Sequence, residues 1–132
     1  MAQLSVNDIS VLIVDDSEHV RALLTMLMRR EGVKHVHQAM DGEAAVEKFK
    51  ELKPSLVFLD NMLPKLSGMD ALKKIRTFDP TAKIIMISAI STPAVVQEAK
   101  ESGASYYLIK PYSPDKVIEV MHRVLGIGGQ SQ

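Results

Sequence analysis

Short runs of apolar residues, each bounded by polar or turn-forming residues, indicate a series of buried strands along the chain. Such runs are typical of a parallel sheet, because its strands are covered on both faces. In one further segment apolar and polar residues alternate, which predicts a less buried strand. We expect strands at residues 11–14, 33–39, 56–59, 84–87 and 106–109.

The segments between these strands carry apolar residues at the spacing of an amphipathic helix. Thr92 and Ser113 each precede a proline, which predicts an N-cap followed by proline at the first helical position. Glycine or proline ends each predicted helix, at Gly32, Pro54, Pro80, Gly103 and Gly126. The apolar stripes comprise Val20, Leu23, Leu24, Leu27 and Met28; Ala45, Val46, Phe49 and Leu52; Met69, Leu72 and Ile75; and Val117, Val120, Met121, Val124 and Leu125.

Strand and helix therefore alternate five times, with strand starts roughly 22 to 28 residues apart, the length of a parallel crossover unit. This order predicts an α/β three-layer sandwich, in which five helices flank a five-stranded parallel sheet. The expected fold is flavodoxin-like and doubly wound, with the strand order 2-1-3-4-5. We expect one domain over residues 9–126, with flexible tails at residues 1–8 and 127–132.

Composition narrows the class of protein. The 132 residues are 46% hydrophobic and 24% charged, as in an ordinary globular domain. Sixteen basic residues balance sixteen acidic ones, which argues against a nucleic-acid partner bound through bulk charge. The lack of cysteine excludes disulfides and thiolate chemistry. No apolar run is long enough to span a membrane and residues 1–10 do not resemble a secretory signal, so we expect a cytoplasmic protein without membrane insertion.

Three aspartates stand where a sheet of this order places its site, beyond the carboxyl ends of the strands at the reversal of strand order. Asp15 and Asp16 follow the first strand and Asp60 follows the third. One such aspartate alone is more often a turn or cap residue. Three carboxylates close together disfavour one another's ionisation. A hard divalent cation bound between them removes this electrostatic cost. The cluster therefore predicts a Mg²⁺ site, with Mn²⁺ as an alternative.

Lys110 and Ser88 end the fifth and fourth strands at the same edge. A lysine and a hydroxyl beside a metal suit a phosphoryl group, whose transfer depends on positioning and electrostatics. Asp60 is the favoured nucleophile for an aspartyl-phosphate, because it stands alone after a buried strand. The adjacent Asp15 and Asp16 are better placed to hold metal.

Four motifs, in this order and spacing, resemble the receiver domain of bacterial response regulators in its stand-alone, CheY-like form. The resemblance covers about residues 9–126. The motifs are VLIVDDS (11–17), LVFLDNMLPKLSG (56–68), IIMISA (84–89) and YYLIKPY (106–112).

The resemblance implies a role for each residue of the site. Asp60 matches the aspartate that accepts a phosphoryl group from a histidine kinase or phosphotransfer protein. Asp15, Asp16, Asp60 and the main-chain carbonyl of Met62 match the Mg²⁺ ligands. Ser88 matches the residue that hydrogen-bonds the phosphoryl group, and Lys110 matches the lysine that pairs with the phosphoryl oxygens. Tyr107 matches the aromatic residue that swings inward when Ser88 shifts.

Further implications concern the backbone and the partners. The bond before Pro111 is expected to be cis, and Pro64 and Gly68 match the turn after the phosphorylated strand. A downstream protein is expected to bind the face formed by the fourth helix, fifth strand and fifth helix. The protein is expected to be a monomer or a weak, phosphorylation-dependent dimer. Apolar Met62 and Ile90 should hinder an attacking water, so we expect the phosphorylated state to be long-lived relative to relatives with polar residues at these positions.

Competing functions fit the residues less well. An aspartyl-phosphate phosphatase needs a second aspartate at the position of Met62, and a flavin carrier needs a hydroxyl- and glycine-rich loop where Asp15 and Asp16 stand. A degenerate receiver is disfavoured because every reactive position is filled. We expect a switch that catalyses its own phosphotransfer and slow dephosphorylation, and not a turnover enzyme. A receiver excised from a longer regulator or hybrid kinase, or a phosphorelay intermediate, stays open.

Side chains away from the site are assigned structural roles. His122 lies off the apolar stripe of the last helix, which predicts an exposed side chain. Four helical methionines are expected to fill the core, because methionine packs into irregular gaps. They are Met26, Met28, Met69 and Met121.

Overall fold

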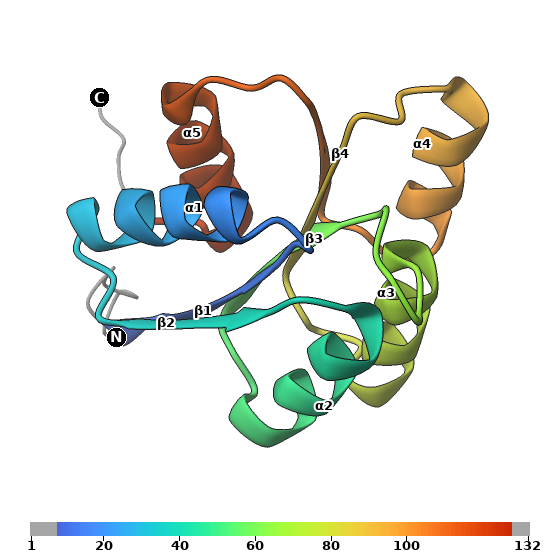
Figure 1. Ribbon diagram of the computed structural model, residues 1–132, viewed down its shortest axis with the longest axis horizontal. Helices are drawn as coiled ribbons and strands as arrows, with labels where there is room; N and C mark the ends of the chain where they lie inside the picture. The colour runs from blue at the N-terminus through green and yellow to red at the C-terminus, as the bar shows by residue number, and fades with distance from the viewer. Residues whose placement is uncertain (1–7, 128–132) are drawn as a thin grey trace.

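The computed structural model describes residues 8–127 (Figure 1). The predicted tails lie outside the described residues, apart from residues 8 and 127. The strands are β1 (Ser10–Val14), β2 (His35–Ala39), β3 (Leu56–Asp60), β4 (Ile84–Ser88) and β5 (Tyr106–Ile109). The helices are α1 (Glu18–Arg30), α2 (Gly42–Leu52), α3 (Gly68–Phe78), α4 (Pro93–Glu101) and α5 (Pro114–Leu125).

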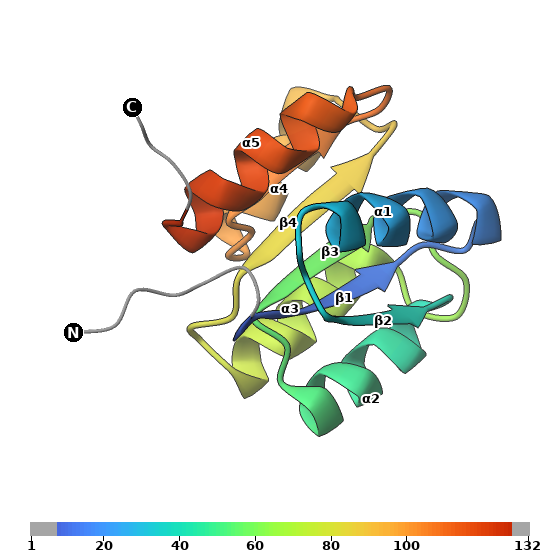
Figure 2. The same cartoon turned by 90° about the vertical axis from the view of Figure 1, so that its left-hand side faces the viewer.

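The five strands form one parallel sheet in the order β2-β1-β3-β4-β5, which confirms the predicted topology. Helices α2, α3 and α4 cover one face, and α1 and α5 cover the other, so the molecule has three layers. Figure 2 shows α1 and α2 on opposite sides of β1 and β2. No helix within residues 8–127 combines the length and the hydropathy that a membrane crossing requires.

Side chains alternate between two cores along each strand, because successive residues of a strand point to opposite faces. Leu59 and Met86 pack toward α2, α3 and α4. Phe58 and Ile87 pack toward α1 and α5. The same alternation places Asp60 on the face shared by α1 and α5, and Ser88 on the opposite face.

The structure differs from the prediction at the start of the second strand and at one helix cap. The second strand starts at His35, and not at Val33, because the Val33 N–H donates to the Met28 carbonyl at 3.0 Å and so belongs to the exit from α1. Thr92 occupies the N-cap position of α4, but its side chain accepts no cap hydrogen bond. Ser113 does cap α5, by accepting from the Lys116 N–H at 3.1 Å.

Two predictions about helical side chains are wrong. Met26 is 61% exposed, because the buried side of α1 runs through Leu24 and Met28, and Met26 lies between them on the other side. His122 is half-buried, with its Nε2 atom 3.5 Å from Glu31 Oε1, because α5 packs beside the end of α1. The other three helical methionines are buried, as predicted.

Candidate functional site

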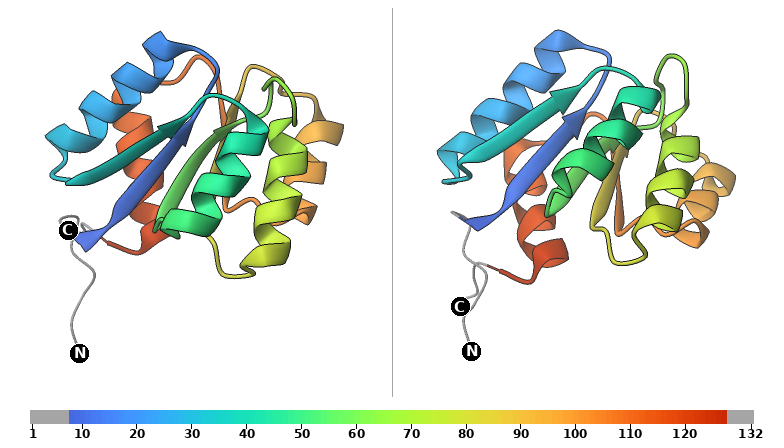
Figure 3. Two further views of the ribbon diagram at one scale, coloured as in Figure 1. Left: turned by 60° about the horizontal axis from the view of Figure 1, so that its bottom comes forward. Right: turned by 90° about the horizontal axis from the view of Figure 1, so that it is seen from below.

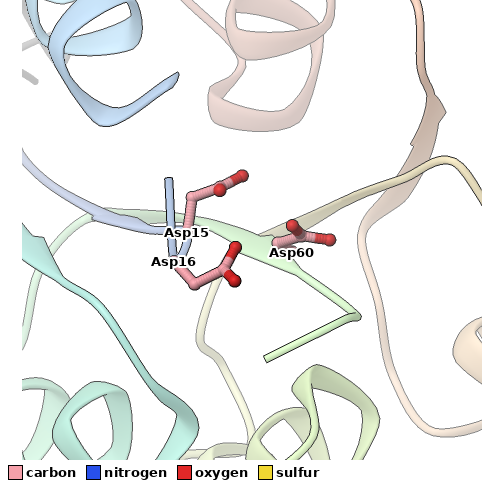
Figure 4. A group of neighbouring side chains, drawn as sticks. All are labelled: Asp15, Asp16 and Asp60. Atoms are coloured by element: carbon pink, nitrogen blue, oxygen red, sulfur yellow. The ribbon is translucent and has the colours of Figure 1, made fainter. Parts of the chain in front are cut away.

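The carboxylates of Asp15, Asp16 and Asp60 meet at the carboxyl edge of the sheet (Figure 4). One oxygen of each lies within 4.8 Å of the others. Asp15 and Asp60 are 3% and 5% exposed, whereas Asp16 is open to solvent. The cluster therefore has a buried base and one accessible side.

Strand pairing brings these carboxylates together. Val14 pairs with Leu59 between β1 and β3, so Asp15 and Asp60 are the next residues along two neighbouring strands. The Asp15 N–H donates to the Ala39 carbonyl at 3.2 Å, which continues the pairing with β2. The Asp15 carboxylate in turn accepts from the Ser17 N–H at 2.9 Å. The acidic pair is thus held between the end of β1 and the start of α1.

Lys110 places one positive charge against the two buried carboxylates. Its Nζ atom lies 3.4 Å from Asp15 Oδ2 and 3.3 Å from Asp60 Oδ2. The Lys110 N–H donates to the Ser88 carbonyl at 2.9 Å, which fixes its backbone beside β4. The peptide bond between Lys110 and Pro111 is cis. The lysine thus spans the edge of the sheet from β5 to β1.

The electrostatics of the cluster favour a cation. Burial raises the pKa of Asp60, and the charge of Asp15 raises it further, against the opposing effects of the Met62 N–H and Lys110. Burial alone lowers the pKa of Lys110, but the two carboxylates outweigh it and raise that pKa above its ordinary value. One ammonium thus faces three carboxyl groups, and the site has an excess of negative charge.

The donor set fits magnesium. It consists of carboxylate oxygens, with no nitrogen or sulfur ligand in the cluster. Hard oxygen ligands suit Mg²⁺ and Mn²⁺, whereas zinc favours histidine and cysteine. Asp16 lies on the accessible side, together with Asp60 and Met62, in an open groove of about 570 Å³.

The loop after β3 is shaped around Asp60. The Met62 N–H donates to Asp60 Oδ1 at 3.1 Å, while the Met62 side chain is 60% exposed. The Pro64 carbonyl accepts from the Leu66 N–H at 2.7 Å within the following turn. A Cβ atom on Gly68 would lie 2.0 Å from the Asp60 carbonyl oxygen, so only glycine fits there. Gly68 therefore allows α3 to start directly against the aspartate.

Ser88 and Tyr107 are linked through one loop residue. The Ile90 N–H donates to Ser88 Oγ at 3.1 Å, and the Tyr107 hydroxyl donates to the Ile90 carbonyl at 2.7 Å. Ser88 is fully buried, and Tyr107 is half-buried against the core under α2, α3 and α4. A movement of the loop between β4 and α4 therefore involves both side chains.

Sequence reasoning missed two residues that hold the site. Arg21 donates from Nη1 to the Asp15 carbonyl at 2.7 Å and from Nε to Gln38 Oε1 at 3.0 Å. Asn61 Oδ1 accepts from the Met69 N–H at 3.0 Å and so holds the start of α3. Asn61 stands beside Asp60 in the motif, which was a usable signal. The partners of Arg21 lie directly after β1 and on β2, and no sequence spacing indicates them.

Tyr112 is a third residue that sequence reasoning did not single out. Burial raises the pKa of its hydroxyl. The charge of Lys110 lowers that pKa, and Asp15 and Asp60 raise it, so the phenol lies within the field of the acidic cluster. Its place as the last residue of the YYLIKPY motif was the only signal in the sequence.

Comparison with known proteins defines the class. Residues 11–122 match the response regulator receiver domain, and the chain belongs to this family. Chemotaxis protein CheY from Thermotoga maritima is 42% identical over 114 residues, which cover 86% of this chain and 95% of that protein. Chemotaxis protein CheY from Bacillus subtilis is 37% identical over 115 residues, which cover 87% and 96%.

A solved structure gives the same result. In the CheX–CheY–BeF₃–Mg²⁺ complex from Borrelia burgdorferi, a chain matches with a TM-score of 0.85 and 36% identity, covering 88% of both chains. The protein is thus a CheY-like receiver domain of a two-component system with an aspartate pocket. Such domains are signalling switches and not turnover enzymes.

Proposed function

We propose that Asp60 accepts a phosphoryl group from a histidine kinase or phosphotransfer protein, and that this changes the affinity of the α4-β5-α5 face for a downstream protein. One observation carries the proposal. The Lys110 ammonium lies within 3.4 Å of the two buried carboxylates, and the third member of the cluster, Asp16, is exposed to solvent. A nucleophile, a fixed counter-charge and an access route are therefore present at one edge of the sheet.

The proposed transfer is a displacement at phosphorus. A carboxylate oxygen of Asp60 forms a bond to phosphorus while the P–N bond of the donor phosphohistidine breaks. The electron pair stays on the imidazole nitrogen of the donor. Lys110 balances the charge that spreads over the phosphoryl oxygens, and it is already in place, so little reorganisation is needed. In hydrolysis, a water oxygen forms the new bond to phosphorus while the bond between Asp60 and phosphorus breaks, which regenerates the carboxylate and releases inorganic phosphate. The protein catalyses this step slowly.

Asp15, Asp16, Asp60 and the Met62 main-chain carbonyl would hold Mg²⁺, with Mn²⁺ as an alternative. When bound, the ion neutralises phosphoryl charge that Lys110 alone cannot balance. The oxygen donor set and the excess negative charge of the cluster support this assignment.

Ser88 and Tyr107 would carry the switch. A phosphoryl group on Asp60 offers new acceptor oxygens, and Ser88 Oγ would donate to one of them. Ser88 Oγ now accepts from the Ile90 N–H, and the Ile90 carbonyl holds the Tyr107 hydroxyl. A turn of Ser88 would therefore release the loop and let the Tyr107 ring move inward. Two packings with different contacts are what a ligand-driven switch requires.

The α4-β5-α5 face is the proposed output surface. Ile109 on β5 is 45% exposed, and the Tyr106 ring lies 5.9 Å from both the Lys116 ammonium and the Arg123 guanidinium. An exposed apolar edge with aromatic and basic groups is typical of protein contacts. We further propose one cytoplasmic receiver domain over residues 9–126, present as a monomer or a weak, phosphorylation-dependent dimer.

Phosphorylation by acetyl phosphate tests the function. With Mg²⁺, the intact mass of the wild-type protein should rise by one phosphoryl group, and hydroxylamine should remove it. Asp60→Asn should stay unmodified, whereas Glu101→Gln, an exposed acid at the end of α4, should behave as wild type. Modification of Asp60→Asn at the wild-type rate would place the nucleophile elsewhere.

A further inference from the structure

A basic groove lies between α2 and α3, apart from the acidic cluster. Figure 3 shows these two helices side by side on one face of the sheet. The groove has a volume of about 510 Å³ and is lined by Val46, Lys50, Lys73, Lys74, Thr77 and Phe78. None of these residues contributes to the site around Asp60.

The groove has a fixed aromatic anchor point. Phe78 is 45% exposed, although it is among the largest apolar side chains of the molecule. Its ring packs edge-to-face on buried Phe49, with the ring centres 6.2 Å apart, and the Lys50 ammonium lies 5.6 Å from its centre. Val46 adds a buried apolar wall. The packing on Phe49 fixes the orientation of the Phe78 ring, and its exposed part offers apolar surface to a partner.

The charge of the groove is one-sided. All three ionisable residues that line it are lysines, although the whole chain has a net charge of zero. Lys73 is paired with Glu98 at 2.9 Å across to α4, where both side chains are about half exposed. Within residues 8–127, no carboxylate lies within ion-pair distance of Lys50 or Lys74. Two unpaired ammonium groups therefore flank the exposed ring.

We infer that this groove binds an acidic amphipathic helix of a partner protein. Apolar residues of that helix would pack on Phe78 and Val46, and its carboxylates would face Lys50 and Lys74. A compact phosphate ligand fits less well, because the lining offers lysine point charges and no arginine fork. Because no lining residue touches Asp60, we expect binding without phosphorylation, as a second contact apart from the output face.

A designed peptide of about four helical turns, with leucine and phenylalanine on one face and glutamate on its flanks, tests the inference. Titration into ¹⁵N-labelled protein should shift the amide signals of α2 and α3. Lys50→Glu with Lys74→Glu should weaken binding at least tenfold. Lys48→Glu, on the side of α2 that faces a different groove, and Asp60→Asn should change the affinity less than twofold. A Phe78→Leu variant tests the aromatic anchor without emptying the site.

Several results would overturn the inference. One is that a sequence-scrambled peptide without amphipathy binds as tightly as the designed peptide. Another is that the Lys50→Glu, Lys74→Glu double variant keeps the wild-type affinity. Binding of phosphatidylglycerol vesicles or heparin through the same lysines, in the absence of peptide binding, would instead assign the groove to a membrane or a polyanion. Since Asp60→Asn keeps this groove intact, the outcome is separate from that of the phosphorylation experiment.

Discussion

The Tyr107 hydroxyl donates a 2.7 Å hydrogen bond to the main-chain carbonyl of Ile90, two residues beyond Ser88. The same loop residue donates its N–H to Ser88 Oγ. A buried strand end and a half-buried aromatic of the neighbouring strand thus share one loop residue as their hydrogen-bond partner. This relationship gives the proposed switch a specific route from the phosphoryl site to β5.

Removing only the Tyr107 hydroxyl should uncouple the two side chains. Tyr107→Phe keeps the ring but loses the bond to Ile90, at a cost of about 1 kcal/mol in the free energy of unfolding. Phosphorylation of Asp60 should stay within about twofold of wild type, because the hydroxyl is not part of the acidic cluster. Amide shifts of Ile90 on adding beryllofluoride and Mg²⁺ should differ between the two proteins. Identical shifts would contradict the coupling.

Neutralising Asp60 should stabilise the metal-free protein at neutral pH. Burial and Asp15 raise the pKa of Asp60 in the folded state, so its ionised form destabilises the fold above that pKa. Asp60→Asn should therefore melt at a higher temperature than wild type. Asp70→Asn, which changes an exposed acid on α3, should lack this gain.

The pH dependence of this effect has a definite sign. Between the ordinary pKa of 3.8 and the raised value, the folded protein binds more protons at Asp60 than the unfolded chain does. The contribution of Asp60 to stability thus improves as pH falls through the raised pKa. The advantage of Asp60→Asn should shrink on acidification, and chemical unfolding at several pH values measures it. An advantage that is constant with pH would contradict the assignment.

Added Mg²⁺ should stabilise the protein through the acidic cluster. Ligand at about one hundred times its dissociation constant adds about 2.7 kcal/mol to the free energy of unfolding. Asp16→Asn removes the accessible carboxylate and should lose most of this gain. Thermal melts with and without Mg²⁺ compare the two proteins, with Glu101→Gln as control. An undiminished gain in Asp16→Asn would exclude that residue as a ligand.

Gly68→Ala should damage the site from outside the carboxylate cluster. The added Cβ would meet the Asp60 carbonyl oxygen at 2.0 Å, so the end of β3 or the start of α3 must shift. We expect a loss of about 1–3 kcal/mol in stability and a slower phosphorylation of Asp60. Gly126→Ala is the matched control, because its φ is +67° but no atom lies within 4 Å of its Cβ position. Gly126→Ala should cost stability alone.

The acidic cluster was predictable because it depends on strand order. The order 2-1-3-4-5 makes Asp15 and Asp60 neighbours whatever the details of packing. Side-chain environments that depend on how two helices meet were not predictable. His122 contacts Glu31 only because α5 lies beside the end of α1, and the bonds of Arg21 depend on the position of β2. The link through Ile90 depends on a loop conformation that no periodicity encodes.

Chemical mapping of the phosphorylated residue tests the central claim most directly. Borohydride reduction converts an aspartyl-phosphate into homoserine, which peptide sequencing by mass spectrometry locates. After treatment with acetyl phosphate and Mg²⁺, we predict homoserine at position 60 and unmodified aspartate at positions 15 and 16. Homoserine at Asp15 or Asp16, or none at position 60, would contradict the assignment of Asp60 as the phosphoacceptor.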